Sequence, residues 1–175
     1  MIRKISVFLV DKLIKVENIF LSMQLDWCFS KKKLEVVEPN ENLSAAYLGK
    51  ADRAILAMRS VEGNFEWEIS AAYYAMYCAA YSLMMKVGVK SEAHSCTIAF
   101  CRRYLRNVLS YSDMRLLESA KEMRERVQYY LVEPSALKGY TTLLEKVAPF
   151  CLKCREASRK DLSYIRKAFD KEFGS

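Results

Sequence analysis

Residues 124–130 contain the densest set of groups that could bind and move charge. The run Arg-Glu-Arg-Val-Gln-Tyr-Tyr brings together the guanidiniums of Arg124 and Arg126, the Gln128 amide and the phenols of Tyr129 and Tyr130. A guanidinium offers phosphate oxygens a planar fork of donors and stays charged at neutral pH. The stretch is therefore a candidate phosphate-binding site. Its alternative is a solvated helix face whose tyrosines lean on neighbouring helices.

The spacing within this stretch leaves two pairs open. Residues five apart on a regular helix lie about 140° apart around its axis, so Arg124 and Tyr129 converge only if the helix ends or widens there. Arg126 and Tyr130 are four apart and share a face. The sequence alone does not decide between the two pairs.

His94, the only histidine, is the second candidate. It follows the short loop 89–92 near the expected start of a helix, where a neutral base, a charged imidazole and an N-terminal cap are all open roles. Further along that helix, Arg102 and Arg103 form part of a basic edge that could bind phosphates. Such an edge is more often simply solvated.

Cysteine spacing suggests zinc at one place only. Cys151 and Cys154 are separated as in many zinc sites, but four good ligands are normally needed and no second pair follows. His94, Cys96 and Cys101 would complete the set only if two distant helices met. We predict buried thiols, no metal site and no cofactor. The sequence also lacks a glycine-rich phosphate loop and a nucleophile with an evident histidine base.

The element that must position these groups is a helix over 66–87. It is apolar on nearly every side, which is typical of a buried central helix. A transmembrane span is the rival interpretation, because a bilayer needs about 20 apolar residues. Membrane tyrosines favour the two interfaces, whereas Tyr73, Tyr74, Tyr77 and Tyr81 run through the middle of this helix. We therefore predict no membrane contact.

The remaining elements are also expected to be helical. An N-terminal helix over 2–29 carries an apolar stripe at Ile5, Phe8, Leu9, Leu13, Val16, Ile19, Phe20, Met23 and Trp27, and a polar connection follows over 30–42. Further helices are predicted over 43–60 after an Asn42 cap, over 94–109, over 114–131 after a Ser112-Asp113 cap, and over 135–173 with a kink or break at Pro149. Gly63-Asn64 should turn the chain, and Gly88 should end the central helix.

Composition supports one all-α domain. The 175 residues include only five Gly and three Pro, and no convincing alternating strand occurs. Short connections favour an up-and-down antiparallel helical bundle with extra N-terminal and C-terminal helices. Within a single domain over 1–175, we expect an N-terminal helix and linker over 1–42, a core over 43–131 and a C-terminal helical segment over 132–175.

Charge and cysteine content indicate the surroundings. The 28 Lys plus Arg against 21 Asp plus Glu leave a net charge of +7, which suits nucleic acid or another acidic partner, or simply a basic surface. The six cysteines form no small secreted framework, and we expect no signal peptide. Both features predict a reducing cytoplasm.

The chain resembles the small stand-alone proteins of the HEPN family (higher eukaryotes and prokaryotes nucleotide-binding). The resemblance covers residues 43–130 best. It is carried by AYYAMY at 72–77, the loop KSEAH at 90–94, and the arginine and tyrosine of Arg124-x4-Tyr129. Their order and spacing together, rather than any one piece, make the similarity.

That resemblance implies a helical bundle that forms a homodimer through the end of helix 114–131. It also implies a metal-independent ribonuclease of toxin–antitoxin type, often encoded beside a minimal nucleotidyltransferase. Arg124 matches the arginine of the family motif Arg-x4-6-His and would bind the scissile phosphate, while Tyr129 stands at the motif histidine. His94 or Tyr129 would then assist attack by the 2′-hydroxyl. The alternative is a non-catalytic interaction module that partners with, or is modified by, the nucleotidyltransferase.

Overall fold

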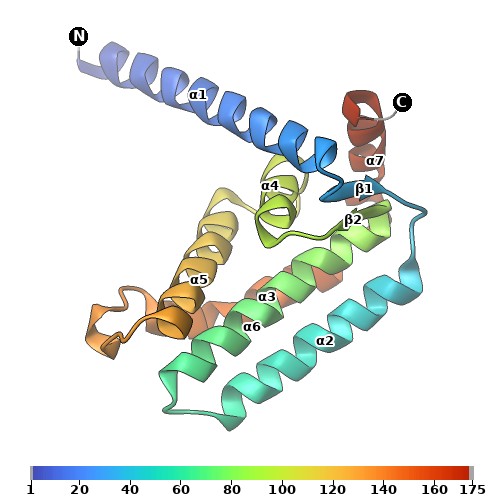
Figure 1. Ribbon diagram of the computed structural model, residues 1–175. Helices are drawn as coiled ribbons and strands as arrows, with labels where there is room; N and C mark the ends of the chain where they lie inside the picture. Colours follow the sequence, from blue (N-terminus) through green and yellow to red (C-terminus); the bar gives the residue numbers. More distant parts are fainter. Residues whose placement is uncertain (1, 174–175) are drawn as a thin grey trace.

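The computed structural model describes residues 2–173, with side chains over 16–158 and 162–172. The described chain folds into helices and two short strands (Figure 1). In chain order these are α1 (Ile2–Ser30), β1 (Leu34–Val36), α2 (Glu41–Ser60), α3 (Phe65–Val87), β2 (Val89–Ser91), α4 (His94–Tyr104), α5 (Tyr111–Tyr129), the short 3-10 helix η1 (Pro134–Ala136), α6 (Tyr140–Glu156) and α7 (Arg159–Phe173). The expected all-α helical bundle is confirmed.

Helix α3 is the centre of the bundle, as the sequence predicts. Helices α2, α5 and α6 pack along it, and α7 contacts its C-terminal part (Figure 1). Ile69, Ala72, Tyr73 and Met76 on α3 are fully buried. Because other helices cover it on several sides, α3 needs apolar residues around most of its circumference.

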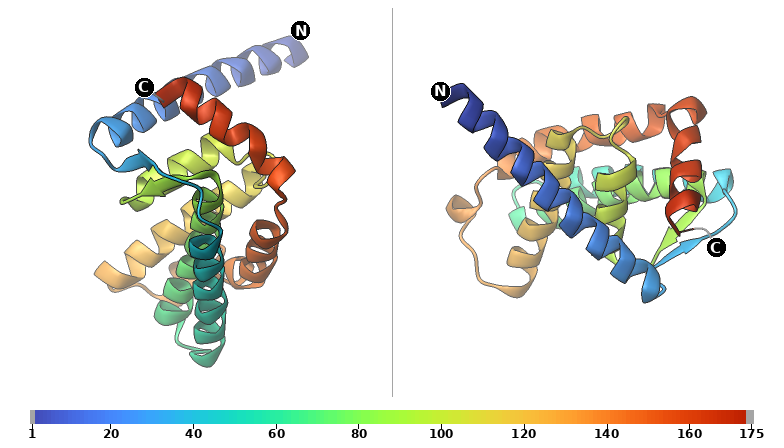
Figure 2. Two further views of the ribbon diagram at one scale, coloured as in Figure 1. Left: turned by 90° about the vertical axis from the view of Figure 1, so that its right-hand side faces the viewer. Right: turned by 90° about the horizontal axis from the view of Figure 1, so that it is seen from above.

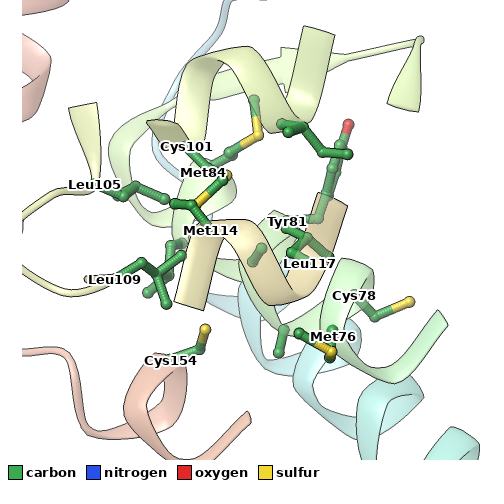
Figure 3. Close-up of a cluster of buried hydrophobic side chains, with 14 of the residues drawn as sticks. Met76, Cys78, Tyr81, Met84, Cys101, Leu105, Leu109, Met114, Leu117 and Cys154 are labelled. Carbon is green, nitrogen blue, oxygen red and sulfur yellow. The ribbon is translucent and has the colours of Figure 1, made fainter. Parts of the chain in front are cut away.

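The core joins side chains from distant parts of the chain. In Figure 3, Met76 and Met84 of α3 lie with Leu117 of α5, Leu105 after α4 and Cys154 of α6. All five residues are fully buried. Burying a side chain of this size stabilises the fold by about 1.5–3 kcal/mol relative to leaving it in water. This shared core fixes α4 and α5 against the same side of α3.

A small antiparallel sheet is the main departure from the expected elements. Strand β1 pairs with β2 in the register Leu34 with Ser91 and Val36 with Val89, so the expected polar connection over 30–42 and the loop over 89–92 are both partly strand. Leu34 and Val89 are buried in the core. Three residues are too few to show the alternation that identifies a strand.

Three helix ends also differ from expectation. Asn40, rather than Asn42, caps α2 by accepting from the Leu43 backbone N–H at 2.8 Å. Ser110 begins α5 in a capping box with Asp113, so the Ser112-Asp113 cap is wrong. Helix α4 ends at Tyr104 and not at residue 109. Near the starts of α2 and α5, two residues that can cap a helix lie within two or three positions of each other. The sequence does not show which of the two is the cap.

Two further expectations concern glycine and proline. Gly88 ends α3 in the left-handed conformation with φ of 72°, as predicted. Pro149 lies inside α6, and the break falls instead at Ala157. A proline costs the helix a hydrogen bond to the carbonyl four residues earlier. Both Pro149 and Glu145 are exposed, so this loss lies on the solvent side of α6.

Cysteine pairing corrects the expectation of thiols alone. Cys28 near the end of α1 forms a disulfide with Cys96 on α4. The described chain keeps thiols, all buried, at Cys78, Cys101, Cys151 and Cys154. Two cysteines 68 residues apart on different helices carry no sequence signal of pairing. Since disulfides are rare in reducing compartments, the cytoplasmic location stays a prediction.

Helix α1 lies across one end of the bundle and extends beyond it (Figure 2). Its C-terminal half contacts α4 and β1. The apolar stripe expected at Ile5, Phe8, Leu9 and Leu13 lies outside the described side chains. Among the described helices, none is both long and apolar enough to cross a membrane.

Candidate functional site

His94 lies in a cluster of tyrosines from α3. Its Nδ1 atom is 2.5 Å from the Tyr73 hydroxyl. Its ring stacks on Tyr77, with centroids 4.2 Å apart and planes 15° apart, and meets the edge of Tyr74 at 6.3 Å. The imidazole is therefore held by a hydrogen bond and by aromatic contacts on more than one side.

The turn between α3 and α4 places His94 at this position. After Gly88, strand β2 carries the chain back beside α3. The Tyr81 hydroxyl holds Ser91 there, because it accepts from the Ser91 backbone N–H at 3.0 Å and donates to the Ser91 carbonyl at 2.9 Å. Helix α4 then begins at His94. Tyr73, Tyr77 and Tyr81 are four residues apart on α3 and share one face, so they line the path of this returning segment.

Arg124 reaches the same cluster from α5. Its Nη2 atom lies 3.3 Å from the Tyr74 hydroxyl, and its guanidinium lies 5.6 Å from the centroid of the Tyr74 ring. Its Nε–H is buried and has no hydrogen-bond partner. A buried donor without a partner costs free energy. Because Nε is closed to solvent, an anion would meet the guanidinium at its Nη atoms.

Charge at the cluster is predominantly positive. Burial, then Arg124, then Lys121 hold the pKa of His94 below its ordinary value of 6.5, while Glu125 opposes them. Glu125 itself accepts from Lys121 at 2.6 Å. His94 is therefore neutral near pH 7, and the cationic form would be recovered by a negative group placed beside it.

The neighbouring phenols are protonated. Burial is the main cause that raises the pKa of Tyr73 well above 10, and burial raises that of Tyr77 to about 12 despite its bond to Thr97. The Tyr73 hydroxyl has no second hydrogen-bond partner among the described side chains. Because a buried hydroxyl proton needs an acceptor, we assign Tyr73 as the donor to His94 Nδ1. The remaining ring nitrogen, Nε2, then carries the His94 proton and acts as a donor.

The structure does not join Tyr129 to Arg124. Tyr129 is 71 % exposed, and Tyr130 follows the helix in extended conformation, 70 % exposed. No hydrogen bond or ring contact links either phenol to Arg124 or Arg126 within residues 16–158. Arg126 is exposed, and Gln128 donates to Ser70 Oγ at 3.2 Å. Helix α5 ends at Tyr129 without the widening that would bring a residue five positions on to the Arg124 face.

Arg102 and Arg103 have carboxylate partners. Arg102 donates to Glu118 at 2.7 Å and also to Glu17 of α1, and Arg103 lies 3.5 Å from Glu172 of α7. A phosphate would have to compete with these carboxylates. We therefore place the two arginines outside the site around His94.

Metal ligands do not gather in the described part of the chain. No group of three or more His, Cys, Asp and Glu side chains there is arranged to hold a metal ion. Cys96 cannot join His94 as a ligand, because its sulfur is in the disulfide. Cys151 and Cys154 are buried thiols on α6, and burial raises the pKa of Cys151 to about 12.

Sequence inspection missed the tyrosines of the site. The sequence placed Tyr73, Tyr74 and Tyr77 in the middle of a buried central helix, which describes Tyr73 correctly but overlooks its partner His94. The sequence signal that could have identified the site was the single histidine after a short turn. When two helices form a hairpin, a residue at the start of the second helix lies against the first helix, here against its aromatic face. Arg124 is 50 residues from Tyr74 in the sequence, so only tertiary packing brings it to the site.

Comparisons with protein-family models, with curated proteins and with solved structures found no match. The candidate site is accordingly defined by its own geometry: a cationic Arg124, a neutral His94 held by Tyr73, and Tyr74 between them.

Proposed function

We propose that this protein binds RNA, or a nucleotide, through a phosphate held by Arg124 and His94, as the resemblance to HEPN proteins implies. The observation that carries the proposal is the Arg124 guanidinium, which lies 3.3 Å from the Tyr74 hydroxyl through Nη2 and close enough to His94 to lower the pKa of the imidazole. Two donors of one positively charged cluster suit an anion with several oxygens. Tyr74, 40 % exposed, offers an aromatic edge to a base.

Net charge +7 favours the same partner class. A basic protein attracts polyanions over a distance of about 10 Å at 0.1 M salt. Arg124 would contact phosphate oxygens through its Nη atoms, and His94 through Nε2. Affinity at this site should fall with added salt, since phosphate contacts release counterions.

Cleavage extends the proposal to a metal-independent ribonuclease of the toxin–antitoxin type. The 2′-hydroxyl would lose its proton to His94 and attack phosphorus, and the bond to the 5′-oxygen would break. The 5′-oxygen would take a proton from water and His94 would return its proton to solvent, leaving a 2′,3′-cyclic phosphate. His94 would need the tautomer with Nε2 unprotonated, which requires Nδ1–H to donate to the Tyr73 oxygen. The observed Tyr73 contact supports binding more directly than cutting.

The proposal includes a cytoplasmic homodimer with a contact at the end of α5. Tyr129, Tyr130 and Leu131 are 71, 70 and 105 % exposed there. Three adjacent apolar or aromatic side chains in water favour a contact with another surface. Such a contact would bring two copies of the α5 end together.

A second candidate function is a non-catalytic module that partners with, or is modified by, a minimal nucleotidyltransferase. The exposure of Tyr129 and Tyr130 favours it, because a modifying enzyme needs an accessible phenol. An adenylyl group on either hydroxyl would add negative charge at the end of α5. Intact-mass analysis after co-expression with the transferase tests this candidate, and an unchanged mass would reject the modification.

The ribonuclease proposal is tested with labelled single-stranded RNA in a buffer containing EDTA. Wild type should give 2′,3′-cyclic or 3′-phosphate ends, and Arg124→Ala should cut about a hundredfold more slowly, because one preorganised charge at the phosphorane is lost. Arg126→Ala is the matched control and should retain activity. If wild type and Arg124→Ala leave the RNA equally intact, cutting is rejected and the interaction module takes its place.

A further inference from the structure

The outer face of α1 is an apolar surface without a cover. Five large side chains on it are more than half exposed. They are Val16 at 65 %, Ile19 at 61 %, Phe20 at 69 %, Met23 at 64 % and Trp27 at 52 %. Single exposed apolar residues are ordinary, but five on one helix face form a continuous patch, and such patches mark interaction sites.

The spacing of this patch is that of a helix-pairing seam. Val16, Phe20, Met23 and Trp27 follow one another at intervals of four, three and four, which repeats every seven residues. In the sequence alone the same spacing continues back to Leu9 and Leu13. Residues at these positions share one stripe along a helix, and two such stripes interlock by inserting side chains into each other's gaps.

The face of α1 that packs on the bundle is a different one. Leu21, Leu25 and Cys28 are buried, and Cys28 is bonded to Cys96 of α4. The helix therefore has one apolar face turned to its own domain and another turned outward. A monomer gains no stability from a second apolar face that is exposed to solvent. The outer face of α1 therefore implies a partner.

We propose that a second copy of this chain packs on the outer face of α1, helix against helix. The five side chains expose roughly 500 Å² of apolar surface, since a free aromatic side chain offers about 150–250 Å² and an aliphatic one less. A stable interface buries about 800 Å² per partner, so this stripe supplies most of the apolar area that is needed. An identical stripe on a second copy is self-complementary about a twofold axis.

The polar residues of α1 beside the described part of the stripe are Glu17, Asn18, Gln24 and Asp26, which are acidic or neutral. Helices that lie on anionic lipid carry Lys and Arg along their whole polar face, whereas the basic residues of α1 all precede Val16 in the sequence, the nearest being Lys12 and Lys15. Glu17 pairs with Arg102, and Asn18 accepts from Arg106 at 3.1 Å, so this border has no strong charge of either sign. The helix-pairing spacing of the apolar residues is therefore the feature that favours a second copy.

The geometry leaves room for this pairing. Helix α1 runs across the end of the bundle, and its N-terminal part extends past the other helices (Figure 2). Its inner side is fixed near the candidate site, where Gln24 donates to the Ser95 carbonyl at 3.4 Å. The pairing requires neither phosphate binding nor the proposed contact at the end of α5, so it is independent of the proposed function.

The test is the mass in solution of the full chain and of three variants, by sedimentation equilibrium between about 1 and 100 μM. The pair Val16→Lys and Met23→Lys in one chain removes two members of the seam. Leu56→Lys is the matched control, since Leu56 is 62 % exposed on α2, away from α1. Tyr130→Ser reports on the α5 end. Thermal unfolding checks that every variant is folded.

We expect wild type to have at least twice the 20.3 kDa of one chain. The Val16/Met23 variant should weaken self-association about a hundredfold or more, because two buried apolar contacts become charges. Leu56→Lys should keep the wild-type mass. The proposal is overturned if wild type stays monomeric at 100 μM, or if association survives undiminished in the Val16/Met23 variant; loss in Tyr130→Ser would then assign the contact to the end of α5. It is also overturned if monomeric wild type binds vesicles of anionic phospholipid through this face.

Discussion

The Tyr73 hydroxyl lies 2.5 Å from His94 Nδ1 and fixes the orientation of the only histidine. Because the buried Tyr73 proton has no other acceptor among the described side chains, we assign the phenol as the donor of this bond and place the His94 proton on Nε2. The side of the imidazole that faces away from Tyr73 is thus a donor, like the neighbouring guanidinium of Arg124.

Nitrogen NMR tests this tautomer directly. We expect the ¹⁵N shifts of His94 at pH 7.5 to show an unprotonated Nδ1 and a protonated Nε2. Tyr73→Phe removes the donor and should shift the tautomer ratio toward Nδ1–H. Tyr81→Phe is a control on the same face of α3, because its hydroxyl bonds Ser91 instead. Predominant Nδ1–H in wild type would contradict the assignment.

The pKa of His94 should respond to Arg124. We expect the imidazole to titrate below 6.5, with a midpoint that rises in Arg124→Ala because one of the two positive neighbours is removed. Arg126→Ala, whose side chain is exposed on the same helix, should leave the midpoint unchanged. A midpoint at or above 6.5 in wild type would contradict the environment described for the ring.

The same shift makes stability depend on pH in a defined direction. The unfolded chain protonates His94 near pH 6.5, whereas the folded chain does so only at lower pH. Between these two values the unfolded state binds more protons. The contribution of His94 to the free energy of unfolding is therefore complete above pH 6.5 and is lost as the pH falls through the folded pKa. Urea titrations of wild type and His94→Gln should differ in slope in this window, and identical slopes would contradict the prediction.

Reduction of the Cys28–Cys96 disulfide should destabilise the fold. The bond closes a loop over a sequence separation of 68 residues, and cross-links of this kind contribute about 2–4 kcal/mol. A reductant should lower the urea midpoint of wild type and have little effect on a chain carrying both Cys28→Ala and Cys96→Ala. An equal response of the two proteins would show that the reductant acts elsewhere.

Gly88 should tolerate substitution less well than Gly63. Both have positive φ, 72° and 86°, so an added Cβ costs about 1–2 kcal/mol at either position. At Gly88 it would also collide with the Val37 carbonyl and the Arg166 guanidinium, whereas nothing lies within 4 Å at Gly63. Gly88→Ala should therefore lower the free energy of unfolding more than Gly63→Ala, as measured with urea. Equal losses would mean that the structure relaxes around Gly88.

The fold class could be predicted because helix periodicity is a local property. The apolar sequence around α3, with Ile69 and Met76 at the core, indicates a central helix whatever its neighbours are. The boundaries were harder to predict: Asn40 and Asn42 are both good caps, and only packing selects Asn40. The β1–β2 pair and the disulfide join residues far apart in sequence, so their existence depends on the tertiary arrangement.

The candidate site could be predicted only in part. Arg124 and His94 stand out in the sequence by residue type. In the structure both contact the ring of Tyr74. Tyr129 was chosen by the motif spacing of the resemblance, yet it lies at the exposed end of α5. The spacing of residues along a helix predicts which way each side chain points. It does not predict where the helix ends, and the end of α5 is what leaves Tyr129 away from the site.

Binding of a phosphate ligand at Arg124 is the claim that most needs measurement. Fluorescence anisotropy of a labelled single-stranded RNA, in low salt with EDTA, gives the dissociation constants of wild type, Arg124→Ala, Arg124→Lys and Arg126→Ala. We predict at least a tenfold loss of affinity in Arg124→Ala, as expected when a charge-assisted hydrogen bond of about 1.5–3 kcal/mol is removed. Arg124→Lys should recover part of it, since a point charge cannot reproduce the fork, and Arg126→Ala should lose much less. Equal affinities of wild type and Arg124→Ala would contradict the account.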